Sequence, residues 1–185
     1  MKISHRMSRR LIAGASLAAA AILLPTAALA ASAGSAAPAR AAMPAACTAA
    51  HTTVWLGTPA DGAAGHSYWQ LEISNTGGTS CTFYGYPGVS ALDVHGHQVG
   101  LPATHSGPKQ LVVLGPGATS HVVLVVVDPG ILCSHPVNAV LLRVYAPGQF
   151  SAHLVPMSLG ACPGKSNLHV DAVHPGAGIP GYTIS

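Results

Sequence analysis

From Cys47 onward the chain alternates apolar and polar residues with a period of two, a pattern typical of half-buried β-strands. The pattern is clearest over 67–75, where Trp69, Leu71 and Ile73 are expected to face a core. The residues between them are expected to face water: Tyr68, Gln70, Glu72 and Ser74.

Other segments of the same kind predict eight or nine strands in all. Over 140–145, Val140, Leu142 and Val144 are expected to point inward and Arg143 outward. The run 122–127 is apolar on both faces, which predicts a strand inside a sheet or one covered by a loop. The full set is predicted over 52–57, 67–75, 81–84, 90–94, 110–114, 120–127, 140–145, 152–157 and 168–172. Turns rich in Gly, Pro and Asn separate these runs, so the predicted fold class is an all-β sandwich.

The N-terminus has the features of an export signal. A basic start that includes Arg9 and Arg10 precedes an apolar run and the triplet Ala-Leu-Ala at 28–30, which predicts a signal peptide over residues 1–30. An uncleaved membrane anchor is the alternative, although the run is mostly alanine and contains Gly14 and Pro25. The paired arginines leave the twin-arginine export route open.

The remaining chain divides into a spacer and one domain. Residues 31–46 are Ala, Ser, Gly and Pro with one charge, which predicts a flexible spacer. Residues 47–185 suffice for a single domain, with a core over 47–162 and a tail over 163–185. Without the leader, four basic side chains stand against five acidic ones, a net charge of −1. Nucleic acid and anionic membrane surfaces are therefore not expected partners.

All the cysteines, Cys47, Cys81, Cys133 and Cys162, lie in this exported part, and their even number indicates disulfides. Three pairings are compatible with the sequence. We favour Cys47 with Cys81 and Cys133 with Cys162, because each closes a loop of about thirty residues between neighbouring elements. The spacing does not match a zinc site, and the residues before Cys47 lack the leucine expected of a lipid-modified cysteine.

The segment 80–90, Ser-Cys-Thr-Phe-Tyr-Gly-Tyr-Pro-Gly-Val-Ser, resembles a motif of the secreted bacterial family catalogued as domain of unknown function 4232. The stretches 71–76, 114–118 and 142–147 add to the resemblance, which covers about Cys47 to Cys162. It implies an exported or lipid-anchored protein of high-GC actinobacteria with an immunoglobulin-like sandwich, and no assigned activity or catalytic residues. The tail beyond Cys162 would then be an addition or an edge strand.

Few residues offer catalytic chemistry. The mature chain has five acidic side chains; Glu72 alternates outward on a strand, and Asp93 and Asp128 stand at strand ends, where Asp is an ordinary turn residue. No Gly-x-Ser-x-Gly elbow, free cysteine or phosphate-binding glycine loop is present. We therefore expect neither an enzyme nor a cofactor.

Histidines and tyrosines are the remaining candidates for binding. Ten histidines fall in the mature chain and are expected to be dispersed over its surface. His95 and His97 form the one close pair and are weak metal-ligand candidates, since Gly96 between them favours a hairpin tip. Tyr84 and Tyr86 are candidate binding residues, with packing at a sandwich corner as the structural alternative.

These observations favour a secreted, extracellular or cell-envelope-associated binding or adhesion module. Its expected partner is a cell-wall polymer or another extracellular protein. The alternative is an extracellular His-rich metal-binding protein, and an enzyme ranks third.

Overall fold

The computed structural model describes residues 42–57 and 60–178, and in this part of the chain nearly all regular structure is β. The predicted signal peptide and most of the predicted spacer lie outside these residues. A 3-10 turn η1 (Ala49–His51) and a short helix α1 (Pro129–Leu132) accompany the strands. The strands are β1 (Thr52–Leu56), β2 (Ala60–Ala63), β3 (His66–Asn75), β4 (Cys81–Tyr84), β5 (Gly88–Leu92), β6 (Gln98–Val99), β7 (Thr104–His105), β8 (Leu111–Leu114), β9 (Thr119–Val127), β10 (Val137–Tyr145), β11 (His153–Ala161), β12 (Leu168–Val170) and β13 (His174–Pro175).

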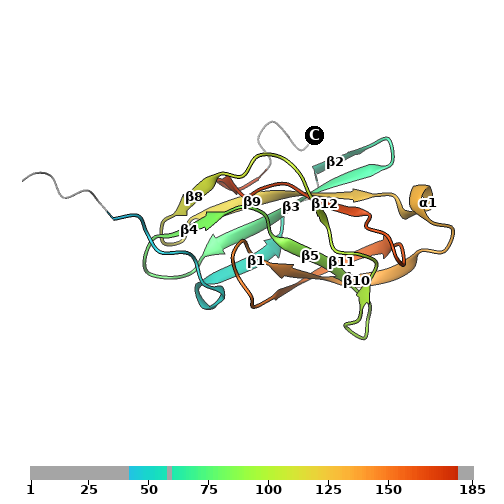
Figure 1. The fold of residues 1–185 in the computed structure, drawn as a ribbon, viewed down its shortest axis with the longest axis horizontal. Helices are drawn as coiled ribbons and strands as arrows, with labels where there is room; N and C mark the ends of the chain where they lie inside the picture. The colour runs from blue at the N-terminus through green and yellow to red at the C-terminus, as the bar shows by residue number, and fades with distance from the viewer. Residues whose placement is uncertain (1–41, 58–59, 179–185) are drawn as a thin grey trace, which may run out of the picture. The chain divides into compact units, whose positions relative to one another are not determined.

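The strands form two larger sheets and one two-stranded ribbon (Figure 1). The seven-stranded sheet has the order β1-β3-β9-β12-β7, with β2 added to β3 and β13 added to β9. The four-stranded sheet has the order β11-β10-β5-β6, and β4 pairs with β8. One buried cluster draws residues from both larger sheets, among them Leu71, Leu124, Leu142 and Val155. The predicted all-β sandwich is therefore confirmed.

All nine predicted strands are present, and the structure adds short ones. β5 begins two residues before the predicted segment 90–94, and β10 and β11 are longer than expected. The sequence prediction missed β2, β6, β7 and β13, which have two to four residues each. Three of these strands have only two residues, too few to show alternation, and β2 reads Ala-Asp-Gly-Ala, without a β-branched or aromatic residue.

A register shift in β10 overturns one prediction, that Val140 points into the core. The pairing of β10 with β11 shifts between Ala139 and Leu141. The buried positions of β10 therefore change there from odd-numbered to even-numbered. Leu142 and Val144 are buried as predicted, but Ala139 is the buried residue before the shift and Val140 is only half-buried.

The tail beyond Cys162 is part of the core, which corrects the predicted boundary at 162. β12 lies between β9 and β7, so it is not an edge strand. Leu168, Val170 and Val173 are fully buried. The buried Asn167 side chain donates to the carbonyl oxygens of Val127 and Gly160 and so joins the ends of β9 and β11.

Both predicted disulfides, Cys47–Cys81 and Cys133–Cys162, are confirmed. Backbone pairing with the domain extends slightly before the predicted boundary at Cys47. The carbonyl oxygen of Ala45 accepts a hydrogen bond from the Thr82 N–H, and the Cys47 N–H donates to Thr82 (2.9 and 3.0 Å). No helix in the described residues is long and apolar enough to cross a membrane.

Candidate binding face

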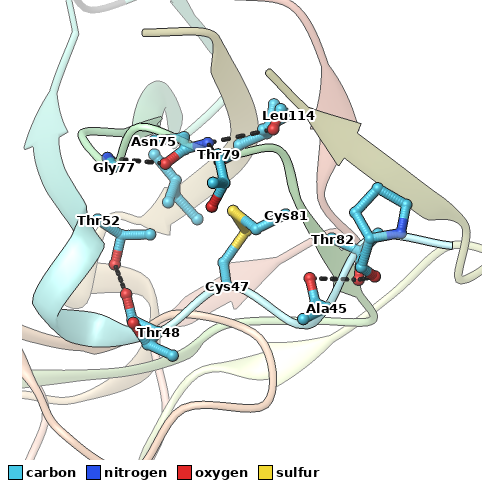
Figure 2. Close-up of a disulfide and its surroundings, with 12 residues drawn as sticks. Ala45, Cys47, Thr48, Thr52, Asn75, Gly77, Thr79, Cys81, Thr82 and Leu114 are labelled. Atoms are coloured by element: carbon cyan, nitrogen blue, oxygen red, sulfur yellow. Dashed lines mark hydrogen bonds between the residues drawn. A yellow bond between two sulfur atoms is a disulfide. The ribbon is translucent and has the colours of Figure 1, made fainter. Parts of the chain in front are cut away.

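The β4–β8 ribbon is anchored to the seven-stranded sheet through two neighbouring links (Figure 2). The first is the Cys47–Cys81 disulfide, which ties β4 to the segment before β1. The second is Asn75, the last residue of β3, whose side-chain amide donates to the carbonyl oxygens of Thr79 and Leu114 (2.9 and 3.1 Å). Because Asn75 is 1% exposed, this polar link is buried and well protected from water.

The outer face of this ribbon is apolar and exposed. Tyr84 lies opposite Leu111 in the register, and Val113 lies opposite Thr82. Their exposed fractions are 61% for Tyr84, 46% for Leu111 and 53% for Val113. We call these three residues the ribbon face. The alternate side chains are buried in the core: Phe83, Val112 and Leu114.

Tyr86, the second tyrosine candidate, is held at the end of the ribbon. Its hydroxyl donates to the carbonyl oxygen of Gly107, and its ring stacks on His105 with 4.8 Å between ring centres. The Lys109 ammonium lies 5.4 Å from the centre of the Tyr86 ring, within cation–π range. These contacts place Tyr86 in a packed corner, whereas Tyr84 presents its ring to solvent.

The predicted hairpin tip at His95 and His97 is present. Both backbone N–H groups donate to Asp93 Oδ1 (2.8 and 2.9 Å), and Gly96 adopts a left-handed conformation with φ +80°. These hydrogen bonds lower the pKa of Asp93, and the bond from His97 has the largest effect. The rings are exposed, with 6.0 Å between their centres. The described residues contain no group of three or more His, Cys, Asp or Glu side chains placed to hold a metal ion.

The prediction that Glu72 faces water is wrong, and so is the prediction that all histidines are on the surface. Glu72 and His121 are cross-strand partners on β3 and β9 and are only 2% and 1% exposed. The C-terminal segment 174–178 covers them: Gly178 N–H donates to Glu72 Oε1, and His121 Nδ1 bonds the Gly176 carbonyl oxygen (both 2.8 Å). Glu72 Oε2 has no hydrogen-bond partner among the described residues.

A second acid–imidazole pair lies beside the first. His174 stacks on His121 with 5.5 Å between ring centres, and its Nε2 lies 3.0 Å from Asp171 Oδ2. Asp171 Oδ1 accepts the Val123 N–H at 2.7 Å. Burial raises the pKa of Glu72 and of Asp171, while hydrogen bonds and the nearby imidazoles act in the opposite direction. The hydrogen bonds of Glu72, His121 and Asp171 therefore connect residues 171–178 to β3 and β9.

We expect Glu72→Gln to raise the melting temperature at neutral pH by about 2 to 4 °C, corresponding to about 1 kcal/mol. Because burial raises the pKa of Glu72, the folded state binds a proton that the unfolded chain has released. The contribution of Glu72 to wild-type stability should therefore fall as the pH rises from about 4 through its folded-state pKa. The glutamine variant lacks this loss, so the two melting temperatures should converge at acidic pH.

Asp93→Asn is the matched control, because the pKa of Asp93 is lowered instead of raised. The Asp93 carboxylate stabilises the folded state at neutral pH, and this contribution is lost as the pH falls through the folded-state pKa. Thermal unfolding followed by circular dichroism from pH 3.5 to 7.5 would compare the two. If Glu72→Gln were destabilising at pH 7, as Asp93→Asn is expected to be, the buried-charge explanation would be wrong.

The sequence reasoning found one residue of the ribbon face and missed two. Tyr84 was a candidate because aromatic residues often anchor partners. Leu111 and Val113 were assigned only to a strand, since a run of four apolar residues does not show which side is exposed.

Comparison with known proteins identifies one related family. A family model described as "Domain of unknown function (DUF4232)" matches residues 47–174. The match includes β12 and so extends beyond Cys162, where the sequence resemblance ended. No curated protein and no solved structure matches the chain.

Proposed function

The chain belongs to the DUF4232 family, and we propose that it is an exported, non-enzymatic binding module that acts at the cell envelope through its ribbon face. The observation that carries the proposal is the exposure of Tyr84, Leu111 and Val113 on one side of a two-stranded ribbon. Contiguous exposed apolar side chains of this kind mark interaction surfaces in soluble proteins. The predicted signal peptide and the two disulfides support export.

The chemistry of the ribbon face favours a protein partner over a polysaccharide. Tyr84 is its one aromatic ring, and its other two members are aliphatic and cannot hydrogen-bond a sugar. Within the described residues, β8 pairs with β4 and with no other strand. β8 reads Leu-Val-Val-Leu and lacks the charge or proline that commonly protects an edge. An extended segment of another extracellular protein would therefore suit this edge, by strand addition with apolar contacts to the face.

The positions of the acidic side chains support a non-enzymatic role. Asp93 accepts hydrogen bonds within a turn, and Asp128 accepts one from the Gly130 N–H at the start of α1. Glu72 accepts a hydrogen bond from the Gly178 N–H, and Asp171 is hydrogen-bonded to the His174 ring. Each of these four carboxylates thus has a structural task.

The test is cosedimentation of residues 31–185 with cell envelopes isolated from the source organism. The double variant Tyr84→Ser/Val113→Thr should raise the protein concentration needed for half-saturation of the envelopes at least tenfold. The reason is that central aromatic and aliphatic anchors dominate interface energies. Phe150→Ser is the matched control, since Phe150 is 97% exposed but lies in the turn between β10 and β11. It removes a similar amount of apolar surface away from the ribbon face and should leave binding unchanged.

Two treatments of the envelopes separate the alternatives. Protease digestion of the envelopes before mixing should abolish pelleting; pelleting that survives digestion would indicate a wall polymer instead of a protein. A chelator should have no effect, and loss of pelleting with chelator would support the metal-binding alternative. Equal losses for the ribbon-face variant and for Phe150→Ser would contradict a role for the ribbon face.

A further inference from the structure

A hollow of about 470 Å³ lies away from the ribbon face, next to α1. In Figure 1 the β4–β8 ribbon and α1 lie at opposite ends of the described domain. Three parts of the chain form its walls: the end of β2 with the following turn and the first half of β3, the junction of β9 with α1, and the second half of β11. Its volume falls within the range of about 300–1,000 Å³ that is usual for small-molecule sites.

The walls of the hollow are fixed in place by several independent contacts. The Asp128 N–H donates to the Gly65 carbonyl oxygen at 2.8 Å, which joins the β2–β3 turn to the start of α1. The Cys133–Cys162 disulfide connects the end of α1 to the end of β11. Gly160 allows Pro129 to pack closely, because a Cβ atom at 160 would lie only 2.7 Å from Pro129 Cγ. A hollow with fixed walls binds a ligand with a smaller entropic cost than a flexible one.

The lining of the hollow combines the indole ring of Trp69 and several aliphatic side chains with polar groups, namely the imidazole of His66 and two serines. Trp69, Val126, Met157 and Leu159 contribute apolar surface. Trp69 Nε1 donates to Ser67 Oγ at 3.2 Å, which fixes the orientation of the half-buried indole ring. An indole face next to a thioether and aliphatic side chains suits an aromatic or aliphatic group.

The one side chain of fixed charge in the lining is negative. Asp128 is exposed, and Oδ1 accepts the Gly130 N–H at 2.9 Å. Trp69 pairs with Leu124 on β9, four residues before Asp128, so the carboxylate and the indole ring lie at different positions along the hollow. The carboxylate complements a cationic group at its end of the hollow, while the ring packs against the body of the same ligand.

From this arrangement we propose that the hollow binds a small organic cation with an aromatic or aliphatic body. The body packs on Trp69 and Met157, and the ammonium group lies toward Asp128 at the rim. This site is separate from the ribbon face and does not depend on the function proposed for it.

The test compares two ligands of similar shape and opposite charge, phenethylammonium and phenylacetate, with residues 31–185 of the protein. We expect saturable binding of phenethylammonium, at least tenfold tighter than that of phenylacetate. NMR spectra locate the site, because the chain has two tryptophans and each gives one indole N–H signal. The Trp69 signal should shift on titration, while that of Trp55, on β1, should not.

Two variants complete the test. Asp128→Asn keeps a residue that caps a helix well but removes the charge, and it should reduce the preference for phenethylammonium to twofold or less. Ser158→Phe places a ring in the hollow from the exposed side of β11 and should abolish binding of both ligands. The ribbon-face variant should bind phenethylammonium as the wild type does. The proposal is overturned by an absence of binding up to 10-millimolar ligand, by a shift of the Trp55 signal alone, or by an unchanged preference in Asp128→Asn.

Discussion

We expect the double variant Cys47→Ala/Cys81→Ala to unfold with a free energy about 3–4 kcal/mol lower than the wild type. The bond joins residues separated by 34 positions, so its loss frees a long loop in the unfolded chain. In the folded state it holds the segment before β1 against β4, next to the backbone hydrogen bonds between Thr82 and its neighbours Ala45 and Cys47. Urea unfolding, followed by tryptophan fluorescence, would measure the loss.

The second disulfide is the internal control for this prediction. Cys133–Cys162 spans 29 positions, nearly the same loop length, but connects α1 to β11 in different surroundings. If restriction of the unfolded chain dominates, Cys133→Ala/Cys162→Ala should cost about the same, within roughly 1 kcal/mol. A difference of more than about 2 kcal/mol between the two variants would show that local packing dominates instead.

The strands and the disulfides could be predicted because their signals are local. Alternation over 67–75 correctly placed Leu71 and Ile73 in the core, where both are fully buried. The disulfide pairing followed from the preference for loops between neighbouring elements, which required no knowledge of the sheet order.

The burial of Glu72 could not be predicted, because it depends on contacts between distant parts of the chain. Alternation correctly puts Glu72 on the face of β3 opposite to Leu71 and Ile73. That face is dry because β9 supplies His121 as the cross-strand neighbour and Gly176 and Gly178 lie over the pair. A short Gly-rich segment shows no period, so nothing in the local sequence indicates that it covers a sheet.

The ribbon face was hidden for a related reason. The apolar run 111–114 has the composition of a strand that is buried on both sides. One face of the β4–β8 ribbon packs on the core, which buries Val112 and Leu114 and leaves Leu111 and Val113 exposed. The difference between a strand buried on both faces and one with an exposed apolar face therefore depends on how the sheets pack together, which no single segment encodes.

The most damaging single glycine substitution should be Gly100→Ala, with an expected loss of about 3 kcal/mol or more in unfolding free energy. Gly100 has φ +74°, and an added Cβ atom would lie 2.7 Å from the carbonyl oxygens of both Cys162 and Lys165. These oxygens belong to the backbone at the start of the tail. The Lys165 oxygen also accepts a hydrogen bond from the Leu101 N–H. The clash can be relieved only by moving the tail that leads into β12.

Gly96→Ala is the matched control, because it has nearly the same backbone conformation without the clash. Its φ is +80°, and no atom lies within 4 Å of an added Cβ. It should cost only the penalty of a left-handed alanine, about 1 kcal/mol. The difference between the two variants in urea unfolding measures the packing of the tail against Gly100. If both variants lost the same free energy, the tail would move aside without a cost in stability. Residues 167–170 would then not be the integral part of the core that the burial of Asn167, Leu168 and Val170 indicates.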